Sequence, residues 1–348
     1  MADANSEKLV LVTGGTGFVG LHCVLQLLQA GYRVKTTLRS LRRKDEVVAA
    51  LQKNGVAGVE NLSFVEADLT ADTNWNEAVK NCAYVLHVAS PISLATSRDE
   101  NDFIRPAVQG ALRVLTAARD ARVKRVVMTS SFGAIGYGHP QMNTPFTEEM
   151  WTDPSCKGIS PYIKSKVLAE KAAWDFIQKE GGALELCVMN PTGIFGPLLG
   201  ASITSSLQII QRLMNGEIKA APQMNFGIID VRDVAELHIR AMELPAAKGQ
   251  RFILQAGATL SLHEVAMILR ASLGDKAEKV PTKVLPNWVV RVASLFNATA
   301  KGILPQLQPK KNISNEKAKQ YFNWTPRTNE EAIVESAESL LRLGLIKN

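Results

Sequence analysis

A glycine-rich segment near the N-terminus constrains the fold of this chain more than any other feature. The segment VTGGTGFVG overlaps the end of the apolar run Leu9–Thr13 and opens a stretch with a helical apolar stripe. Gly17 and Gly20 fit GxGxxG together with Gly15, and fit GxxGxxG together with Gly14. Glycines at this spacing allow a tight turn and let the backbone approach a pyrophosphate, which the helix N-terminus attracts. The order of strand, glycines and helix therefore predicts a dinucleotide-binding loop.

The first half of the chain alternates short apolar, β-branched runs with amphipathic helical stretches. This alternation is typical of βαβ units around a parallel sheet that is covered on both faces. The predicted strands are Leu9–Thr13, Arg33–Leu38, Leu62–Glu66, Tyr84–Val88, Arg125–Thr129 and Glu185–Met189. After Asn190 proline and glycine become frequent and helices dominate, including one over 261–273, where Ser261 and Glu264 form a capping-box pattern.

The expected fold class is α/β: a Rossmann-type doubly wound parallel sheet with a smaller, mostly helical C-terminal domain. We expect residues 1–200 to form the NADP-binding domain, with a returning segment near 226–256, and residues 201–348 to form mainly the substrate-binding domain. At 348 residues the chain is long enough for about two domains. Ligands of open α/β sheets bind at the carboxyl ends of the strands, so this edge is where we expect the site.

The end of the second predicted strand indicates which dinucleotide is bound. NAD-binding folds place an acidic residue there, whereas an arginine accommodates the 2′-phosphate of NADP. This chain has Arg39 at that position, and a dense basic cluster, 42–44, follows. A guanidinium pairs with a phosphate through two hydrogen bonds. The predicted cofactor is therefore NADPH/NADP+, and Asp68 with Leu69, after the third strand, is placed to meet the adenine ring.

The overall charge and the cysteine content exclude several other classes of protein. The net charge is +7 and the pI is about 9.2, yet the positive residues are spread along the chain and accompany no nucleic-acid-binding motif. Four scattered cysteines and five histidines show no metal-ligand spacing. An acidic start and the lack of a long apolar stretch argue against a signal peptide or membrane span. We expect a cytoplasmic protein that binds no metal, nucleic acid or membrane.

The candidate catalytic residues lie on a predicted strand end and on a predicted helix. Tyr162 and Lys166 are four residues apart in a helical stretch after Pro161, so they share one helix face. An ammonium group beside a phenol favours the phenolate and lowers the pKa of the phenol, which then serves as an acid and base near neutrality. Thr129 and Ser131 lie at the end of a buried strand, where a serine hydroxyl can donate a hydrogen bond to a carbonyl oxygen.

Together these residues resemble the extended branch of the short-chain dehydrogenase/reductase family. TGGTGFVG matches its TGxxGxxG loop, and Ser131, Tyr162 and Lys166 match its Ser–Tyr–Lys triad in chain order. The segments HVASP, NPTGIFGP, IDVRDVAELH and FNWTPR extend the similarity along nearly the whole chain. Within this branch the chain is most similar to the dihydroflavonol reductase, cinnamoyl-CoA reductase and microbial aldehyde reductase group.

The resemblance implies cofactor contacts that the residue pattern alone does not give. Arg39 matches the NADP-selecting arginine of that group, and either Lys44 or Arg43 would supply a second basic side chain. Tyr162, Lys166 and Thr129 would also lie along the cofactor. The remaining implied contacts are Gly14, Thr16, Gly17, Phe18, Val19, Gly20, Asp68, Leu69, Val88, Ala89, Ser90, Pro191, Thr192, Gly193, Ile194 and Ser206.

One position departs from the flavonoid-reducing members of the group. They carry an asparagine five residues after the catalytic serine, where this chain has Gly136. The departure argues against a dedicated flavonoid reductase and favours a less polar substrate pocket. The candidate lining residues are Ile92, Phe132, Phe195, Met224 and Phe226.

The activity that the resemblance implies is NADPH-dependent reduction of an aldehyde or ketone. The alternatives are a nucleotide-sugar epimerase or dehydratase, a 3β-hydroxysteroid dehydrogenase-like enzyme, and a non-catalytic NADP-sensing regulator. Arg39 argues against the epimerases, which typically retain NAD, and the Tyr–Lys pair argues against the regulator. The partner would be a small carbonyl compound, and both a monomer and a homodimer are compatible with the sequence.

Overall fold

A central parallel sheet organises the protein. The computed structural model describes residues 5–56, 58–91, 99–140, 142–200, 202–296, 304, 307 and 309–347. Seven strands pair in the order β11-β6-β5-β4-β1-β2-β3, and every pairing is parallel. The strands are β1 (Leu9–Val12), β2 (Arg33–Leu38), β3 (Leu62–Glu66), β4 (Tyr84–His87), β5 (Arg125–Thr129), β6 (Glu185–Pro191) and β11 (Arg251–Leu254). The expected Rossmann-type sheet is thus confirmed, and the six predicted strands differ from the observed ones by at most two residues at an end.

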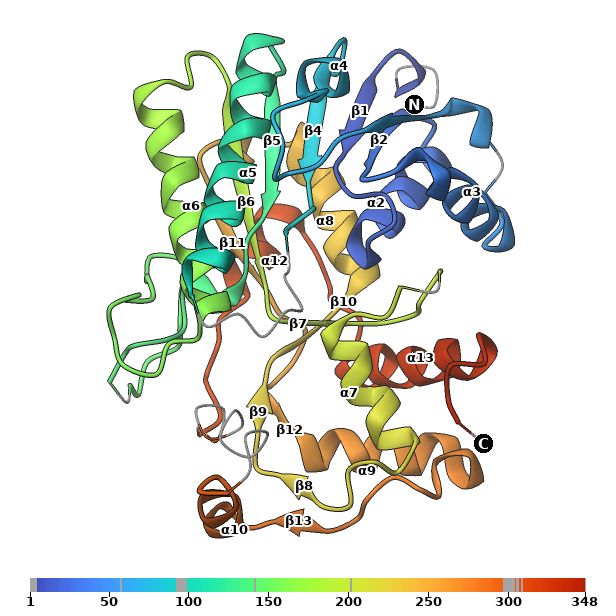
Figure 1. The fold of residues 1–348 in the computed structure, drawn as a ribbon, viewed down its shortest axis with the longest axis vertical. Coiled ribbons are helices and arrows are strands. Elements are labelled where there is room, and N and C mark those ends of the chain that lie inside the picture. Colours follow the sequence, from blue (N-terminus) through green and yellow to red (C-terminus); the bar gives the residue numbers. More distant parts are fainter. Residues whose placement is uncertain are drawn as a thin grey trace.

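Helices cover both faces of the sheet (Figure 1). One face packs against α2, α3, α8 and α12, and the other packs against α4, α5 and α6. The helices are α2 (Phe18–Gln29), α3 (Lys44–Lys53), α4 (Trp75–Val79), α5 (Asn101–Asp120), α6 (Pro161–Lys179), α8 (Val231–Glu243) and α12 (Glu316–Phe322). Because apolar side chains are buried on both faces, β1 has Val10, Leu11 and Val12 fully buried, as its continuous apolar run predicts.

A smaller, mostly helical part lies beyond the carboxyl ends of the strands (Figure 1). Its core joins α7 (Ser205–Met214), α9 (Leu262–Leu273) and α13 (Asn329–Arg342). Ser261 and Glu264 form the predicted capping box of α9. Short strands connect this part: β7 (Gly193–Phe195) with β10 (Ile228–Asp230), β8 (Ala221–Pro222) with β13 (Val284–Leu285), and β9 (Asn225–Phe226) with β12 (Leu260–Ser261); α10 (Asn287–Ala293) follows β13. Within the described residues, no helix is both long and apolar enough to cross a membrane.

A buried ion pair fixes the amino-terminal side of the sheet. Arg125 is 1% exposed, and two of its guanidinium nitrogens donate to the Glu185 carboxylate at 2.9 and 2.6 Å. Its third nitrogen donates to the carbonyl oxygens of Ala241 and Leu244, both at 2.6 Å, and so satisfies the end of α8. This one side chain therefore connects β5, β6 and α8.

We expect Arg125→Met to lower the free energy of unfolding by roughly 3 kcal/mol, because it leaves a largely buried carboxylate with only the exposed Lys248 at 3.5 Å and leaves the Ala241 and Leu244 carbonyl oxygens without their donor. The matched control is Lys179→Met, which breaks an exposed ion pair with Asp175 on α6 and is expected to change stability by about 0.5 kcal/mol or less. Urea denaturation followed by circular dichroism measures both. Equal effects of the two substitutions would contradict a structural role for the buried pair.

Candidate active site

A cavity of about 2040 Å³ runs along the carboxyl ends of the strands, between the sheet and the smaller helical part. Each strand of the main sheet from β1 to β6 delivers residues to it, because parallel strands all end at the same edge. The predicted residues that line it are Gly14, Thr16, Gly17, Phe18, Val19, Gly20, Arg39, Asp68, Leu69, Val88, Ala89, Ser90, Thr129, Ser131, Phe132, Tyr162, Lys166, Pro191, Thr192, Gly193, Ile194, Ser206 and Phe226. The structure thus brings almost the entire predicted set into one space.

The glycine loop between β1 and α2 has no room for side chains. Gly14 has φ +75°, and a Cβ added there would lie 3.0 Å from the Cβ of Ala89. A Cβ on Gly20 would lie 2.2 Å from the carbonyl oxygen of Gly14. Gly17 begins the first turn of α2, whose backbone N–H groups and dipole attract anions. The loop therefore fits the pyrophosphate of a dinucleotide.

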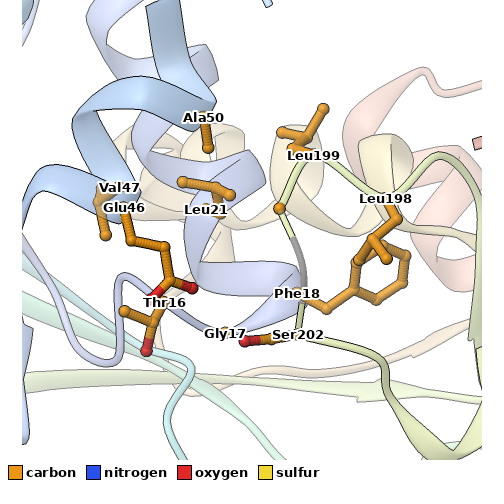
Figure 2. A pocket seen from close by; sticks show the side chains of 11 residues that line it. Thr16, Gly17, Phe18, Leu21, Glu46, Val47, Ala50, Leu198, Leu199 and Ser202 are labelled. Carbon is orange, nitrogen blue, oxygen red and sulfur yellow. The ribbon is translucent and has the colours of Figure 1, made fainter. Parts of the chain in front are cut away.

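A small hollow of about 10 Å³ adjoins this loop, where residues 198–200 and Ser202 lie beside the starts of α2 and α3 (Figure 2). It shares Thr16, Gly17, Phe18 and Ser202 with the large cavity. A volume of this size holds one water molecule at most. We therefore regard it as a packing gap beside the loop.

Two arginines supply the positive charge beyond the end of β2. Arg39 and Arg43 both line the cavity. Arg43 donates to the hydroxyl of Thr16 at 3.3 Å and to that of Ser202 at 3.2 Å, so it connects the glycine loop to Ser202. It also pairs with the Glu46 carboxylate through two hydrogen bonds of 2.8 Å. Hydrogen bonds from Thr70, aided by the charge of Arg39, hold the pKa of Asp68 below its usual value. A carboxylate and two guanidinium groups suit the hydroxyl groups and phosphate of an adenosine 2′-phosphate.

The structure separates the two candidates for the second basic residue. Lys44 is a described residue that lies outside the cavity lining, with its Nζ 5.6 Å from the centre of the Phe64 ring. The cavity lining therefore favours Arg43 as the second basic residue, and the cofactor contact of Lys44 stays a prediction. The sequence could not decide, because residues 41–43 form a short turn of 3₁₀ helix whose orientation depends on tertiary contacts.

The three candidate catalytic residues meet at the ends of β5 and α6. Ser160 caps α6 and Pro161 occupies its first position, so Tyr162 lies in the first turn and Lys166 one turn later on the same face. The hydroxyl of Ser131, just after β5, accepts a hydrogen bond from the Gly133 N–H at 3.0 Å and lies near enough to Tyr162 to influence its pKa. The Nζ of Lys166 lies 5.8 Å from the centre of the Tyr162 ring.

Burial governs the protonation of this group. Tyr162 is 41% exposed because its ring forms part of the cavity wall. The protein packed around its hydroxyl nevertheless raises the pKa of Tyr162 above its usual value, and the nearby Ser131 hydroxyl opposes that rise. Burial also lowers the pKa of Lys166 to about 8, against the charge of Glu170. The sequence-based expectation that Lys166 lowers the pKa of Tyr162 is wrong for this arrangement, because the ammonium is itself desolvated and lies over the ring.

The far end of the cavity is apolar and aromatic, as expected, but its lining differs from the prediction. Phe132 and Phe226 line it, whereas Phe195 is 1% exposed and stacks beneath Phe226 at 6.0 Å. Met224 is half-buried and, although described, does not contribute to the wall. Ile92 lies outside the described residues.

Several residues of this wall were missed by the sequence analysis. Tyr137, His139, Met142, Phe146 and Ile313 line the cavity beside Phe132. Phe146 and Ile313 form an isolated β-bridge that connects segments far apart in the chain. No local sequence pattern predicts a contact between segments so far apart, so this part of the wall is found only from the tertiary structure.

Gly136, where the sequence departs from the flavonoid reductases, also lies on this wall. A Cβ added there would come within 2.2 Å of the Phe132 ring. The ring therefore takes the space that a side chain at 136 would need, and the pocket is less polar at this point, as predicted.

Comparisons with known proteins agree with this geometry. The model of the NAD dependent epimerase/dehydratase family matches residues 10–257. Cinnamoyl-CoA reductase CAD2 of Medicago truncatula is 33% identical over 346 residues, which is 98% of either chain. Dihydroflavonol 4-reductase of Zea mays is 34% identical over 279 residues, covering 77% of this chain and 75% of its own length.

The solved structures include a similar protein with a bound cofactor. The crystal structure of yeast methylglyoxal/isovaleraldehyde reductase Gre2 complexed with NADPH superposes with a TM-score of 0.80 at 27% identity and covers 97% of this chain and 99% of its own. The family match spans well over half of the chain, and it includes the glycine loop and the Ser–Tyr–Lys residues. The chain therefore belongs to the NAD dependent epimerase/dehydratase family, the extended short-chain dehydrogenases/reductases.

Proposed function

We propose that the protein is an NADPH-dependent carbonyl reductase that converts an aldehyde or ketone into an alcohol. The observation that carries this proposal is that Ser131, Tyr162 and Lys166 line the same cavity as Arg39 and Arg43. The same cavity therefore contains a proton donor for a carbonyl oxygen and basic side chains for a 2′-phosphate. The relatives named as cinnamoyl-CoA and dihydroflavonol reductases, and the NADPH in the Gre2 structure, support the same activity.

The residues of the chain divide the work of the reaction. The glycine loop would hold the pyrophosphate, Arg39 and Arg43 the 2′-phosphate, and Lys166 the nicotinamide ribose. When bound, the reduced nicotinamide supplies the hydride for the carbonyl carbon. Ser131 and Tyr162 would hydrogen-bond the carbonyl oxygen, and Tyr162 would donate the proton that completes the alcohol. The raised pKa of Tyr162 suits this step, because the phenol keeps its proton until negative charge develops on the oxygen.

We also propose a reducing compartment such as the cytoplasm. All four cysteines lie in the described part of the chain and are free thiols, three of them buried. A reducing environment keeps such thiols unpaired.

Tyr162→Phe should lower kcat by about two orders of magnitude or more, because it removes the proton donor. NADPH affinity, measured by fluorescence titration, should change little. Tyr137→Phe is the matched control, since it removes another hydroxyl from the same cavity; it should keep kcat within about tenfold of the parent. Turnover near that of the parent in Tyr162→Phe would remove this residue from the mechanism.

The basic side chains should determine the choice of cofactor. Arg39→Asp should raise the KM for NADPH by roughly tenfold or more, because a carboxylate repels the 2′-phosphate, while the KM for NADH stays equal or falls. Arg43→Ala should raise the KM for NADPH by roughly 10–100-fold, the value of a lost charge-assisted hydrogen bond. Lys44→Ala is the control and should leave it unchanged. Equal efficiencies with NADH and NADPH in the parent protein would contradict these roles.

The affinity for NADPH should fall as the pH rises through about 8. Lys166 has a pKa lowered to about 8, so it is charged below that value and loses its proton above it. If the bound ribose favours the ammonium, linkage makes binding tighter below pH 8 and weaker above, by up to about tenfold per pH unit. Fluorescence titrations without carbonyl substrate, from pH 6.5 to 9.5, measure this. Lys166→Arg stays charged and should show no such slope; a slope unaltered in that variant would refute the assignment to Lys166.

A further inference from the structure

A second ionisable residue lies directly behind the catalytic helix face. Glu170 follows Lys166 by four residues on α6, so the two side chains share one face of the helix. Glu170 is fully buried and Lys166 is 8% exposed. Only Lys166 lines the cavity, and Glu170 lies behind the wall. Burying a carboxylate lowers the stability of the fold unless hydrogen bonds or opposite charges compensate it. The groups around Glu170 therefore indicate its role.

The groups that donate hydrogen bonds to Glu170 come from α6, from the carboxyl ends of β5 and β6, and from β11. One carboxylate oxygen accepts hydrogen bonds from the Ser130 hydroxyl at 2.5 Å and from the Asn190 amide at 2.8 Å. The other accepts from Arg251 Nε at 2.6 Å and from Trp174 at 3.4 Å. The carboxylate therefore connects α6 to the carboxyl ends of β5 and β6 and to β11.

This network also reaches the catalytic serine. Ser130 is the neighbour of Ser131 in the chain, and Asn190 donates a second hydrogen bond from the same amide to the carbonyl oxygen of Ser131 at 3.1 Å. The carbonyl group of Ser131 is thus held by a side chain that is itself bound to Glu170, and the preceding residue, Ser130, donates its own hydroxyl to the same carboxylate.

Glu170 is also the one negative charge that opposes the desolvation of Lys166. The titratable groups that face Lys166 are Tyr162 and Glu170 from α6 and His87 from β4. Burial lowers the pKa of His87 to about 3, so this ring is neutral, and Tyr162 keeps its proton. Asp102 of α5 is a further acidic residue that lines the same large cavity. On the far side, Arg251 from β11 faces Glu170.

We propose that Glu170 is a positioning residue: its buried carboxylate keeps the Lys166 ammonium charged and holds the segment of Ser131 in place for the reaction. It touches neither cofactor nor substrate and acts through these two residues. The inference rests on the proposed function, since it assigns Lys166 to the cofactor ribose. It predicts that the charge of Glu170, and not only its shape, sets the pH range in which NADPH binds well.

The test compares substitutions at Glu170 and at Arg251, the two members of the buried ion pair. Glu170→Gln keeps the size of the side chain and removes its charge, so the pKa of Lys166 should fall further. The pH at which NADPH affinity begins to decline should then move down by about one unit, the order of effect expected when a neighbouring buried charge is removed. Arg251→Lys is the matched control. It breaks the guanidinium geometry toward Glu170 and toward the Glu148 and Met150 carbonyl oxygens but leaves Glu170 charged, so the profile should stay in place.

A third variant keeps the test decisive if Glu170→Gln does not fold. Removing one partner of a buried pair destabilises a protein strongly, whereas replacing both partners by neutral groups is often tolerated. Glu170→Gln combined with Arg251→Met should therefore fold. Because it also removes the positive charge of Arg251, the shift should have the same direction but be smaller than in Glu170→Gln. Fluorescence titrations with NADPH between pH 6.5 and 9.5, with melting temperatures for each variant, provide the readout.

The outcomes separate the two levels of the proposal. A parent protein that does not bind NADPH would overturn the proposed function itself. If the parent binds with a pH-dependent affinity and the profile of folded Glu170→Gln or of the double variant is unmoved, the role of Glu170 is wrong. An equal shift in Arg251→Lys would also overturn it, because the effect would then come from general loss of packing.

Discussion

Lys166 carries a positive charge into the protein interior, where α6 begins beside the carboxyl ends of β5 and β6. Desolvation lowers the pKa of Lys166. The carboxylate of Glu170, one turn further along α6 and more deeply buried than the lysine, opposes this effect. That carboxylate in turn needs donors, which β5, β6 and β11 supply. The parallel sheet makes the arrangement feasible, because only parallel strands bring so many carboxyl ends to one edge.

The charged groups at the two ends of the cavity differ in how far they are exposed to solvent. At the end of the cavity beyond β2, Arg39 is exposed, so its charge costs little to maintain, and the half-buried guanidinium of Arg43 is paired with the Glu46 carboxylate at 2.8 Å. At the catalytic end the groups are enclosed, and a charge there must be balanced inside the protein. This balance is incomplete: Asn190 Oδ1 and one terminal nitrogen of Arg251 are buried and have no hydrogen-bond partner among the described residues. The network around Glu170 therefore favours a fixed geometry over maximal stability.

The sequence predicted those parts of the molecule that local patterns determine. The strands β1 to β6 are recognisable because continuous apolar runs separated by amphipathic helices match a sheet buried on both faces. The glycine loop, Arg39 and the triad follow strand ends or share a helix face, so their convergence follows from topology. By contrast, the choice of Arg43 over Lys44 depends on how a short turn packs. Phe195 and Met224 were assigned to the pocket by residue type alone, and Glu170 looks in sequence like any charged residue one turn from a lysine.

In the aromatic wall of the cavity, the effect of the residue at position 136 depends on the residue at position 132. In the flavonoid-reducing relatives the position equivalent to Gly136 is an asparagine, and its loss suggests by itself a pocket with extra space. The structure contradicts that simple view, because the Phe132 ring fills the volume beside Gly136 and packs edge-on against Phe146 at 5.8 Å. A side chain at 136 would therefore need the Phe132 ring to move, so the two positions share one space. Together they replace a hydrogen-bonding group by an aromatic surface at this point of the cavity.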